Sequence, residues 1–487
     1  MKEKRKPADR PSGYWLLANS SSRGVTVFLV LGFMGVFAIV LGTISSYVLM
    51  QGRYGQALYA REIALHVAEA GLEYYRWFLA HNPVIMTDGT GLVSPYTYAV
   101  NDPEGGSLGS ATVSATLNLQ CGVVQWADLT SVGAADVNPT YARRLSVRYI
   151  RPSSAEYSYI LNGNVWAGTS RTIRGPYHSN GGVRMDAVHN SDVTSSVATW
   201  TCDAGTGCPS TQAGVFGAGS TPALWTYPVS TITVPFSASG VNFTDLRTKA
   251  QSGGGIYYAA ASGSLNERGY HLVFNAAGTV TIYRVTSTNE EESYSSQYGN
   301  TTEPSIITGE TLLGTYNVPS SCALLFFEDR VWVEGTVNGK VTVVAATPDS
   351  GTTPDAYLNN NIYYAAYDGT DGITVIAERN VLLPLVVPDT MEIHGIFVAS
   401  NGHYGRDHFR DWQVASQYDQ YITRDTLITV GTVVSNGRTG TSWQCSGSYC
   451  SGFATRYDYY DQQLAFSPPP FTPVASTDYK FTLWREQ

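Results

Sequence analysis

The feature that most constrains this chain is an uncharged apolar stretch near its N-terminus. No Asp, Glu, Lys or Arg occurs from Val25 to Gly52. As a helix, residues 25–50 would be about 39 Å long at about 1.5 Å per residue, which is enough to cross a bilayer with some tilt. A cleaved secretory signal has a shorter apolar core, of about 7–15 residues. The stretch therefore predicts an uncleaved, membrane-spanning helix.

The distribution of charge predicts how this helix is oriented. Residues 1–24 carry six basic side chains against two acidic ones, whereas the whole chain has a net charge of −9. A basic segment that precedes an apolar span stays in the cytoplasm. We therefore expect a single-pass protein of the cell membrane, with a cytoplasmic N-terminus and an extracytoplasmic remainder. That remainder is acidic and shows no basic patch, so no nucleic-acid partner is expected.

The helical pattern continues beyond the apolar stretch. Leu58, Leu65, Leu72 and Leu79 recur every seven residues, which predicts that one helix face packs against the head or against neighbouring helices. Pro83 ends the helix, because the residue before a proline disfavours the helical backbone conformation.

The N-terminal region resembles a known family. A basic leader ending in Gly24, an apolar span, an amphipathic continuation and the run Ala-Glu-Ala-Gly-Leu-Glu at 68–73 resemble the amino-terminal region of PilX-type minor pilins, in the type IV pilin and pseudopilin group. The resemblance implies cleavage by a prepilin peptidase between Gly24 and Val25, and packing of the helix among other pilins in a filament. Most pilins carry Glu at the fifth mature position, where this chain has Leu29.

The rest of the chain has the composition of a β-rich head. Only 14% of the chain is charged, and it contains 48 Gly and 33 Tyr. Ser-Asn-Gly recurs at 179–181, 400–402 and 435–437, each time after a short apolar or aromatic run. Short strands with repeated glycine turns favour stacked coils, that is, a right-handed parallel β-helix. A β-sandwich is the alternative, since Asn-Gly also favours two-residue hairpins.

These patterns divide the chain into consecutive regions. We expect a basic leader (1–24), a transmembrane helix (25–52), its amphipathic continuation (53–82), a small β region (83–155), a β-helix-like head (156–446) with insertions at 203–230 and 285–305, and a C-terminal cap (447–487). The insertions are polar or rich in Gly, Thr and Pro, which predicts surface loops. The alternation at 479–484 predicts a strand that closes the last coil.

The cysteines suggest disulfides. They form two closely spaced pairs and leave two single residues: Cys202 with Cys208, Cys445 with Cys450, and Cys121 with Cys322. Two short-loop bridges, with the single residues left as a further pair, are the simplest arrangement. A zinc site is the alternative; only the second pair has ligand spacing, and the sequence places no His beside it.

No established catalytic motif is present. His403, Asp407, His408 and Asp411 form the densest cluster of titratable residues, but their spacing matches no known metal site, and a polar coil edge explains them equally well. Residues 368–372, DGTDG, read as a turn, because a calcium loop would need further ligands. We therefore expect no enzyme activity, no metal and no cofactor.

These observations predict a structural and interaction protein. The principal expectation is a PilX-like minor pilin or pseudopilin that supports type IV pilus assembly or surface adhesion, with the membrane, other pilins and a surface glycan or protein as partners. One alternative is a membrane-anchored surface adhesin without a pilus. Another is a β-helix carbohydrate-active enzyme, in which Asp407 and Arg410 would act.

Overall fold

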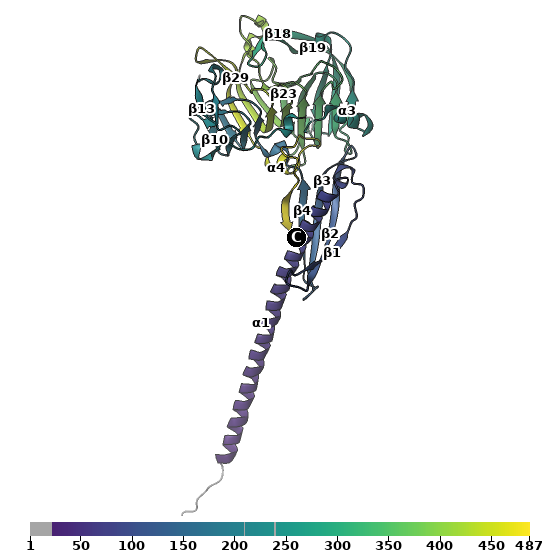
Figure 1. The fold of residues 1–487 in the computed structure, drawn as a ribbon, viewed down its shortest axis with the longest axis vertical. Helices are drawn as coiled ribbons and strands as arrows, with labels where there is room; N and C mark the ends of the chain where they lie inside the picture. Colours follow the sequence, from purple (N-terminus) through teal and green to yellow (C-terminus); the bar gives the residue numbers. More distant parts are fainter. Residues whose placement is uncertain (1–21, 209, 238–239) are drawn as a thin grey trace, which may run out of the picture.

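The computed structural model describes residues 22–208, 210–237 and 240–487; most of the expected leader, residues 1–21, lies outside this range. A long helix, α1 (Ser22–His81), carries a small antiparallel sheet on its C-terminal half and a large β-rich head beyond that sheet (Figure 1). The long apolar helix and the β-rich head are confirmed.

Helix α1 is the one helix of the described residues that is long and apolar enough to cross a membrane. Its large apolar side chains between Val25 and Met50 are 45–81% exposed. The helix ends just before Pro83, where the Asn82 amide donates a hydrogen bond to the Leu79 carbonyl oxygen over 3.2 Å. A short helix, α2 (Ile85–Asp88), follows.

The small sheet is antiparallel throughout. Its strands lie in the order β1 (Tyr96–Asn101), β2 (Ser107–Gln120), β3 (Val123–Ala135), β4 (Ala142–Ile150) and β31 (Lys480–Glu486). The C-terminal half of α1 packs on one face, where Leu72 and Tyr75 lie in a cluster with Leu129 and Val147. This face is therefore a closed helix-on-sheet core.

The position of β31 corrects one expectation. The alternation at 479–484 was expected to close the last coil of the head, but β31 pairs with β4, with Phe481 opposite Tyr149. The chain thus returns from the head to the sheet it left at the end of β4. The head is an insertion between two neighbouring strands of the small sheet.

The head contains a long ladder of parallel strands. Along it lie β16 (Ile256–Tyr258), β20 (Leu324–Phe327), β22 (Lys340–Ala345), β24 (Gly372–Ala377), β26 (Thr390–Ala399), β28 (Thr423–Ser435), β5 (Tyr159–Leu161), β8 (Tyr177–Ser179), β11 (Val193–Ser195) and β15 (Trp225–Thr226). One aligned row of side chains runs through these strands: Ile256, Leu325, Val343, Val375, Phe397, Val433, Tyr159, Tyr177, Val193 and Trp225. All of these except the two terminal residues are buried, so the row is a continuous core.

Other parallel ladders flank the first. One contains β17 (Tyr270–Asn275), β21 (Val331–Val337), β23 (Ala356–Tyr364), β25 (Val381–Leu382) and β27 (Tyr404–Gly405). Another places β30 (Ser448–Tyr459) between β28 and β7 (Arg171–Arg174), with β10 (Val188–His189) next. A further one joins β6 (Val165–Ala167), β9 (Val183–Met185) and β14 (Val215–Phe216).

The order along the main ladder differs from the order along the chain. Strands β5 to β15 run outward in one direction, and β16 to β28 return from the opposite end. The two runs meet where Val433 of β28 lies opposite Tyr159 of β5. The connection between the runs includes α3 (Phe243–Ser252).

The remaining elements are short pairs, turns and single helices. Strands β12 (Thr199–Thr201) and β13 (Thr211–Ala213) pair antiparallel, and so do β29 (Ser442–Cys445) and β30. Helix α4 (Gln462–Phe466) precedes β31 in the chain. Short 3₁₀ helices occupy Ser154–Glu156, Ala204–Thr206, Pro222–Leu224, Val234–Phe236, Leu265–Glu267 and Ser416–Tyr421.

Neither expected insertion is a simple loop. Residues 285–305 belong to a long antiparallel hairpin of β18 (Thr279–Ser295) and β19 (Gly299–Asn317), at the end of the head away from α1 (Figure 1). The hairpin was missed because its outer part is polar and exposed on alternate residues, which removes the apolar signal of a strand. Within 203–230, the described residues form short strands and 3₁₀ turns, and β15 joins the main ladder.

The cysteines are paired as disulfides. The structure joins Cys202 to Cys208, Cys445 to Cys450, and Cys121 to Cys322. The last bridge spans 201 residues and ties the β2–β3 turn of the small sheet to the head beside β20. It is a covalent link between the small sheet and the head.

Candidate functional site

The leucines at heptad spacing do not all have the same surroundings. Leu72 and Leu79 are buried, and Leu65 is partly buried against the same core, so these three face the protein's own sheet. Leu58 is 43% exposed and lies outside that core. This helix face therefore packs on the sheet from Leu65 to Leu79 and is exposed at Leu58.

The run at 68–73 lets the helix approach the sheet closely. A Cβ atom added to Gly71 would lie 2.6 Å from the Ala111 Cβ atom and 2.6 Å from the Ser131 Oγ atom. Ala68 is fully buried on the same face. In contrast, Glu69 points outward, where its Oε2 atom lies 3.3 Å from the Nδ1 atom of exposed His66. Small residues inside and acids outside are what this packing requires.

Gly24, Val25 and Leu29 lie on the exposed apolar half of α1. A Cβ atom on Gly24 would have no neighbour within 4 Å. Exposed apolar surface of this length is typical of a membrane span or of an interface with other helices. In the described structure this half of the helix therefore makes no contact with the rest of the chain and is available to contact a membrane or other helices.

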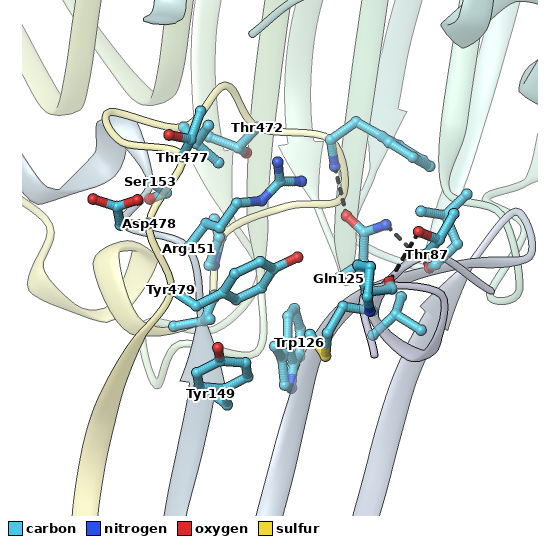
Figure 2. Close-up of a pocket in the computed structure, with 18 of the residues that line it drawn as sticks. Thr87, Gln125, Trp126, Tyr149, Arg151, Ser153, Thr472, Thr477, Asp478 and Tyr479 are labelled. Carbon is cyan, nitrogen blue, oxygen red and sulfur yellow. Dashed lines mark hydrogen bonds between the residues drawn. The ribbon is translucent and has the colours of Figure 1, made fainter. Parts of the chain in front are cut away.

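A cleft of about 1010 Å³ separates the small sheet from the head (Figure 2). Gln125 spans part of it, because its side-chain oxygen accepts a hydrogen bond from the Phe471 amide over 3.0 Å. Arg148 stacks 4.5 Å from the ring centroid of Trp126 and donates to the Phe466 carbonyl oxygen over 3.0 Å. These contacts attach the C-terminal segment to the sheet, so the cleft is part of the junction that orients the head.

The structure splits the predicted titratable cluster. His403 and Asp407 are both buried and lie 3.1 Å apart, measured from Nε2 to Oδ1. Asp411 is exposed, and Arg410 stacks 5.3 Å from the ring centroid of Tyr294. The four predicted residues therefore do not form one site.

His408 lies against the disulfide of Cys445 and Cys450. Its Nε2 atom is 3.7 Å from each sulfur, and its ring stacks on Trp443 at 5.2 Å between centroids. Burial lowers the pKa of His408, and the nearby Arg410 lowers it further. The expectation that the cysteine pair has no His beside it was wrong. While the disulfide is formed, however, its sulfurs are not thiolate ligands.

The DGTDG segment is a turn. The Thr370 amide donates to an Asp368 carboxylate oxygen over 3.0 Å, and the Gly339 amide donates to buried Asp371 over 2.7 Å. Both carboxylates therefore satisfy backbone amides, one in this turn and one in the neighbouring turn between β21 and β22.

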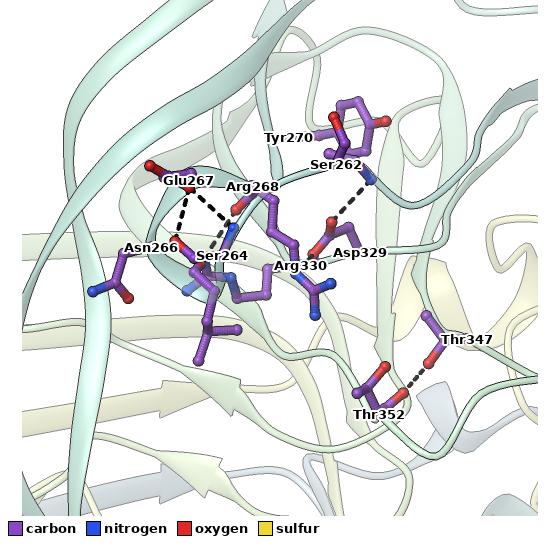
Figure 3. A network of polar contacts seen from close by, with 12 residues as sticks. Ser262, Ser264, Asn266, Glu267, Arg268, Tyr270, Asp329, Arg330, Thr347 and Thr352 are labelled. Carbon is purple, nitrogen blue, oxygen red and sulfur yellow. Dashed lines mark hydrogen bonds and ion pairs between the residues drawn. The ribbon is translucent and has the colours of Figure 1, made fainter.

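A second cleft, of about 880 Å³, lies in the head and is lined in part by residues 301–304 of β19. Asp407 lines it together with residues that sequence analysis did not select, above all Glu303, Asp355 and Arg379. Arg330 fixes one wall: its guanidinium donates to the carbonyl oxygens of Pro304, over 2.8 Å, and Arg268, over 2.9 Å. Figure 3 shows the polar network around Arg268, Asp329 and Arg330.

Glu303 is the most perturbed acid in this second cleft. Its side chain is 3% exposed, and burial raises its pKa to about 8, assisted by the nearby charge of Asp407. The Ser305 hydroxyl offsets this rise in part but does not reach hydrogen-bond geometry. Burial therefore favours the neutral carboxylic acid form of Glu303.

Comparisons with known proteins do not assign this chain to a family. No family model matches the chain, and no curated protein matches it. Among solved structures, the chain is similar to the competence-associated pilin ComZ from Thermus thermophilus, with 13% identity and a TM-score of 0.27. The alignment covers 88% of this chain and 97% of that one. At this TM-score the similarity carries no argument about function.

Proposed function

We propose that this protein is a pilin-like structural protein, a minor pilin or pseudopilin of the PilX type, which displays a β-solenoid head. One observation carries the proposal: the two halves of α1 have different surroundings. The C-terminal half packs on the small sheet through Leu65, Leu72 and Leu79, whereas the half from Val25 to Met50 presents exposed apolar side chains. A helix built in this way is suited first to a membrane and then to packing among other helices.

The parallel ladders support a right-handed parallel β-helix as the form of the head. The recurring Asn-Gly turns contribute to this assignment, because asparagines of two Ser-Asn-Gly segments stack at one corner on Asn162, which precedes Gly163 in a third turn. The Asn162 amide group donates to the Asn436 side-chain oxygen over 2.7 Å, and Asn180 donates to that of Asn162 over 2.8 Å. Each coil thus satisfies a polar side chain of the next, as a solenoid requires.

The proposed role is non-enzymatic, with the head on the extracytoplasmic side, where it supports pilus assembly or adhesion. The same anchor could serve a surface adhesin without a pilus. The two roles differ in the fate of the leader, because a filament subunit needs Val25 as its mature N-terminus.

Mass spectrometry of the membrane-extracted protein tests the proposal. In cells with an active prepilin peptidase, we expect the mature chain to begin at Val25. A Gly24→Asp variant should keep its leader and serves as the uncleaved control. Cysteine cross-linking at Phe28, compared with Tyr59 near the sheet, should capture other pilins in the wild type. An intact leader in the wild type, or no cross-linked pilin, would overturn the filament role.

A further inference from the structure

The second cleft runs along a corner where successive coils turn. Arg330, Asp355 and Asn380 line the cleft and occupy this corner in consecutive coils, just before β21, β23 and β25. The Val331 amide donates to the Asp355 carbonyl oxygen over 3.2 Å, and the Ala356 amide donates to that of Asn380 over 2.9 Å. Because parallel strands are about 4.8 Å apart, side chains at this corner recur at that interval along the cleft. A periodic, elongated surface suits a linear ligand.

Glu303 provides an independent sign that the cleft takes a ligand. Neither of its carboxyl oxygens has a hydrogen-bond partner among the described residues, although the side chain is 97% buried and lines the cleft. The adjacent backbone is held firmly, since Arg330 binds the Pro304 carbonyl oxygen and the Trp332 indole donates to that of Ser305 over 2.7 Å. A buried, fixed and unpaired carboxyl group requires an explanation, because folding alone gains nothing from it.

The lining restricts the class of ligand. Six carboxyl groups face four guanidinium groups, which disfavours a polyanion such as a nucleic acid or an acidic polysaccharide. The backbone groups of the corner already bond between coils, so a peptide has no free strand edge there to extend. A ligand rich in hydroxyl groups fits best, because each hydroxyl both donates and accepts, as the carboxylic acid, amide and guanidinium groups here require.

The rim adds a stacking surface. Tyr298 is 45% exposed, and the Arg379 guanidinium lies 6.0 Å from its ring centroid. Asp355 accepts a hydrogen bond from Arg379 Nε over 2.8 Å and so holds that guanidinium in place. An aromatic ring beside a fixed planar cation offers an apolar face with polar groups at its edge.

We propose that this cleft binds a linear, uncharged polysaccharide laid across the stacked coils. Glu303 bonds a sugar hydroxyl at the base, and Tyr298 stacks on a sugar ring at the rim. The inference deepens the proposed function, since it rests on display of the head at the cell surface. It does not depend on assembly into a filament.

The test is titration calorimetry on the full chain in detergent micelles. The probes are cellohexaose, chitohexaose and maltohexaose, with hexagalacturonate as the anionic comparison. We expect saturable binding of at least one neutral probe and weaker binding of the uronate. Glu303→Met should raise Kd at least about tenfold, Glu303→Gln should raise it less, and Tyr298→Ala should also weaken binding.

Glu290→Met is the matched control, because Glu290 lies on the same hairpin, is exposed and does not line the cleft. Its Kd should equal that of the wild type. Glu303→Met should melt at or above the wild-type temperature, which separates loss of binding from loss of fold. No saturation with any neutral probe, tighter binding of the uronate, or an unchanged Kd in Glu303→Met would overturn the proposal. An intact leader would overturn the filament role and leave this result unaffected.

Discussion

Glu303 makes the stability of the head dependent on pH in a predictable direction. In an unfolded chain this carboxyl ionises near its ordinary pKa of 4.5, whereas burial raises the pKa of the folded group to about 8. Between these values the folded protein holds one more proton than the unfolded chain. Stability therefore falls as pH rises, by about 1.4 kcal/mol per pH unit from this group alone.

Replacing Glu303 with Gln removes the ionisation and keeps the shape. Over the interval from about pH 5 to pH 8, the wild type should lose about 4 kcal/mol relative to Glu303→Gln. The variant should therefore be the more stable protein at pH 8. This prediction describes a group that costs stability, which is expected where a residue is kept for binding.

The assay is denaturant unfolding of the wild type and of Glu303→Gln at several pH values between about pH 5 and pH 8. Tryptophan fluorescence, to which fully buried Trp332 of the head contributes, reports the transition. Glu290→Gln is the control, since an exposed acid on the same hairpin should leave the pH dependence unchanged. Wild-type and Glu303→Gln curves that stay parallel from pH 5 to pH 8 would refute the reasoning, because they would mean that Glu303 is ionised in the folded state.

Further predictions concern the other contacts. Burial opposes protonation of His271, but hydrogen bonds to two glutamates outweigh it and raise the His271 pKa, so its stabilising effect should be present below about pH 6.5 and fade as pH rises through the folded pKa. Thermal unfolding of the wild type and of His271→Gln, below about pH 6.5 and again above the folded pKa, measures this stabilising effect. Leu72→Ala should cost about 2–5 kcal/mol in unfolding experiments, whereas exposed Leu58→Ala should leave folding unchanged and reduce cross-linking to other pilins. Replacing Cys121 and Cys322 with Ser should cost about 2–5 kcal/mol and expose the junction to limited proteolysis.

Local patterns in the sequence predicted the parts of the fold that depend on local spacing. The uncharged run and the heptad leucines indicated α1, because helix length and periodicity are properties of neighbouring residues. The disulfides of the two closely spaced cysteine pairs could be predicted for the same reason. The Ser-Asn-Gly recurrence indicated stacked strands, and two of its asparagines, Asn436 and Asn180, are joined through Asn162 of another Asn-Gly turn.

Features that depend on distant residues were not predictable in this way. The β31 alternation looks the same whether it closes a coil or pairs with β4, and only the fold selects between them. His408 lies 37 residues before Cys445 in sequence, yet its ring contacts the disulfide. Glu303 belongs to a polar segment that resembled a surface loop, and its burial depends on residues distant in the sequence, such as Asp407 and Asp355.

The position of the insertion explains how so large a head can be carried by so small a sheet. Ile150, the last residue of β4, lies opposite Lys480, the first residue of β31. The chain therefore leaves the sheet and returns to it at the same point, with Ser153 bridged to Val474 just beyond. Two adjacent connections alone would act as a hinge. The disulfide from Cys121, at the turn after β2, attaches the head at a separate point and therefore restrains rotation of the head about that hinge.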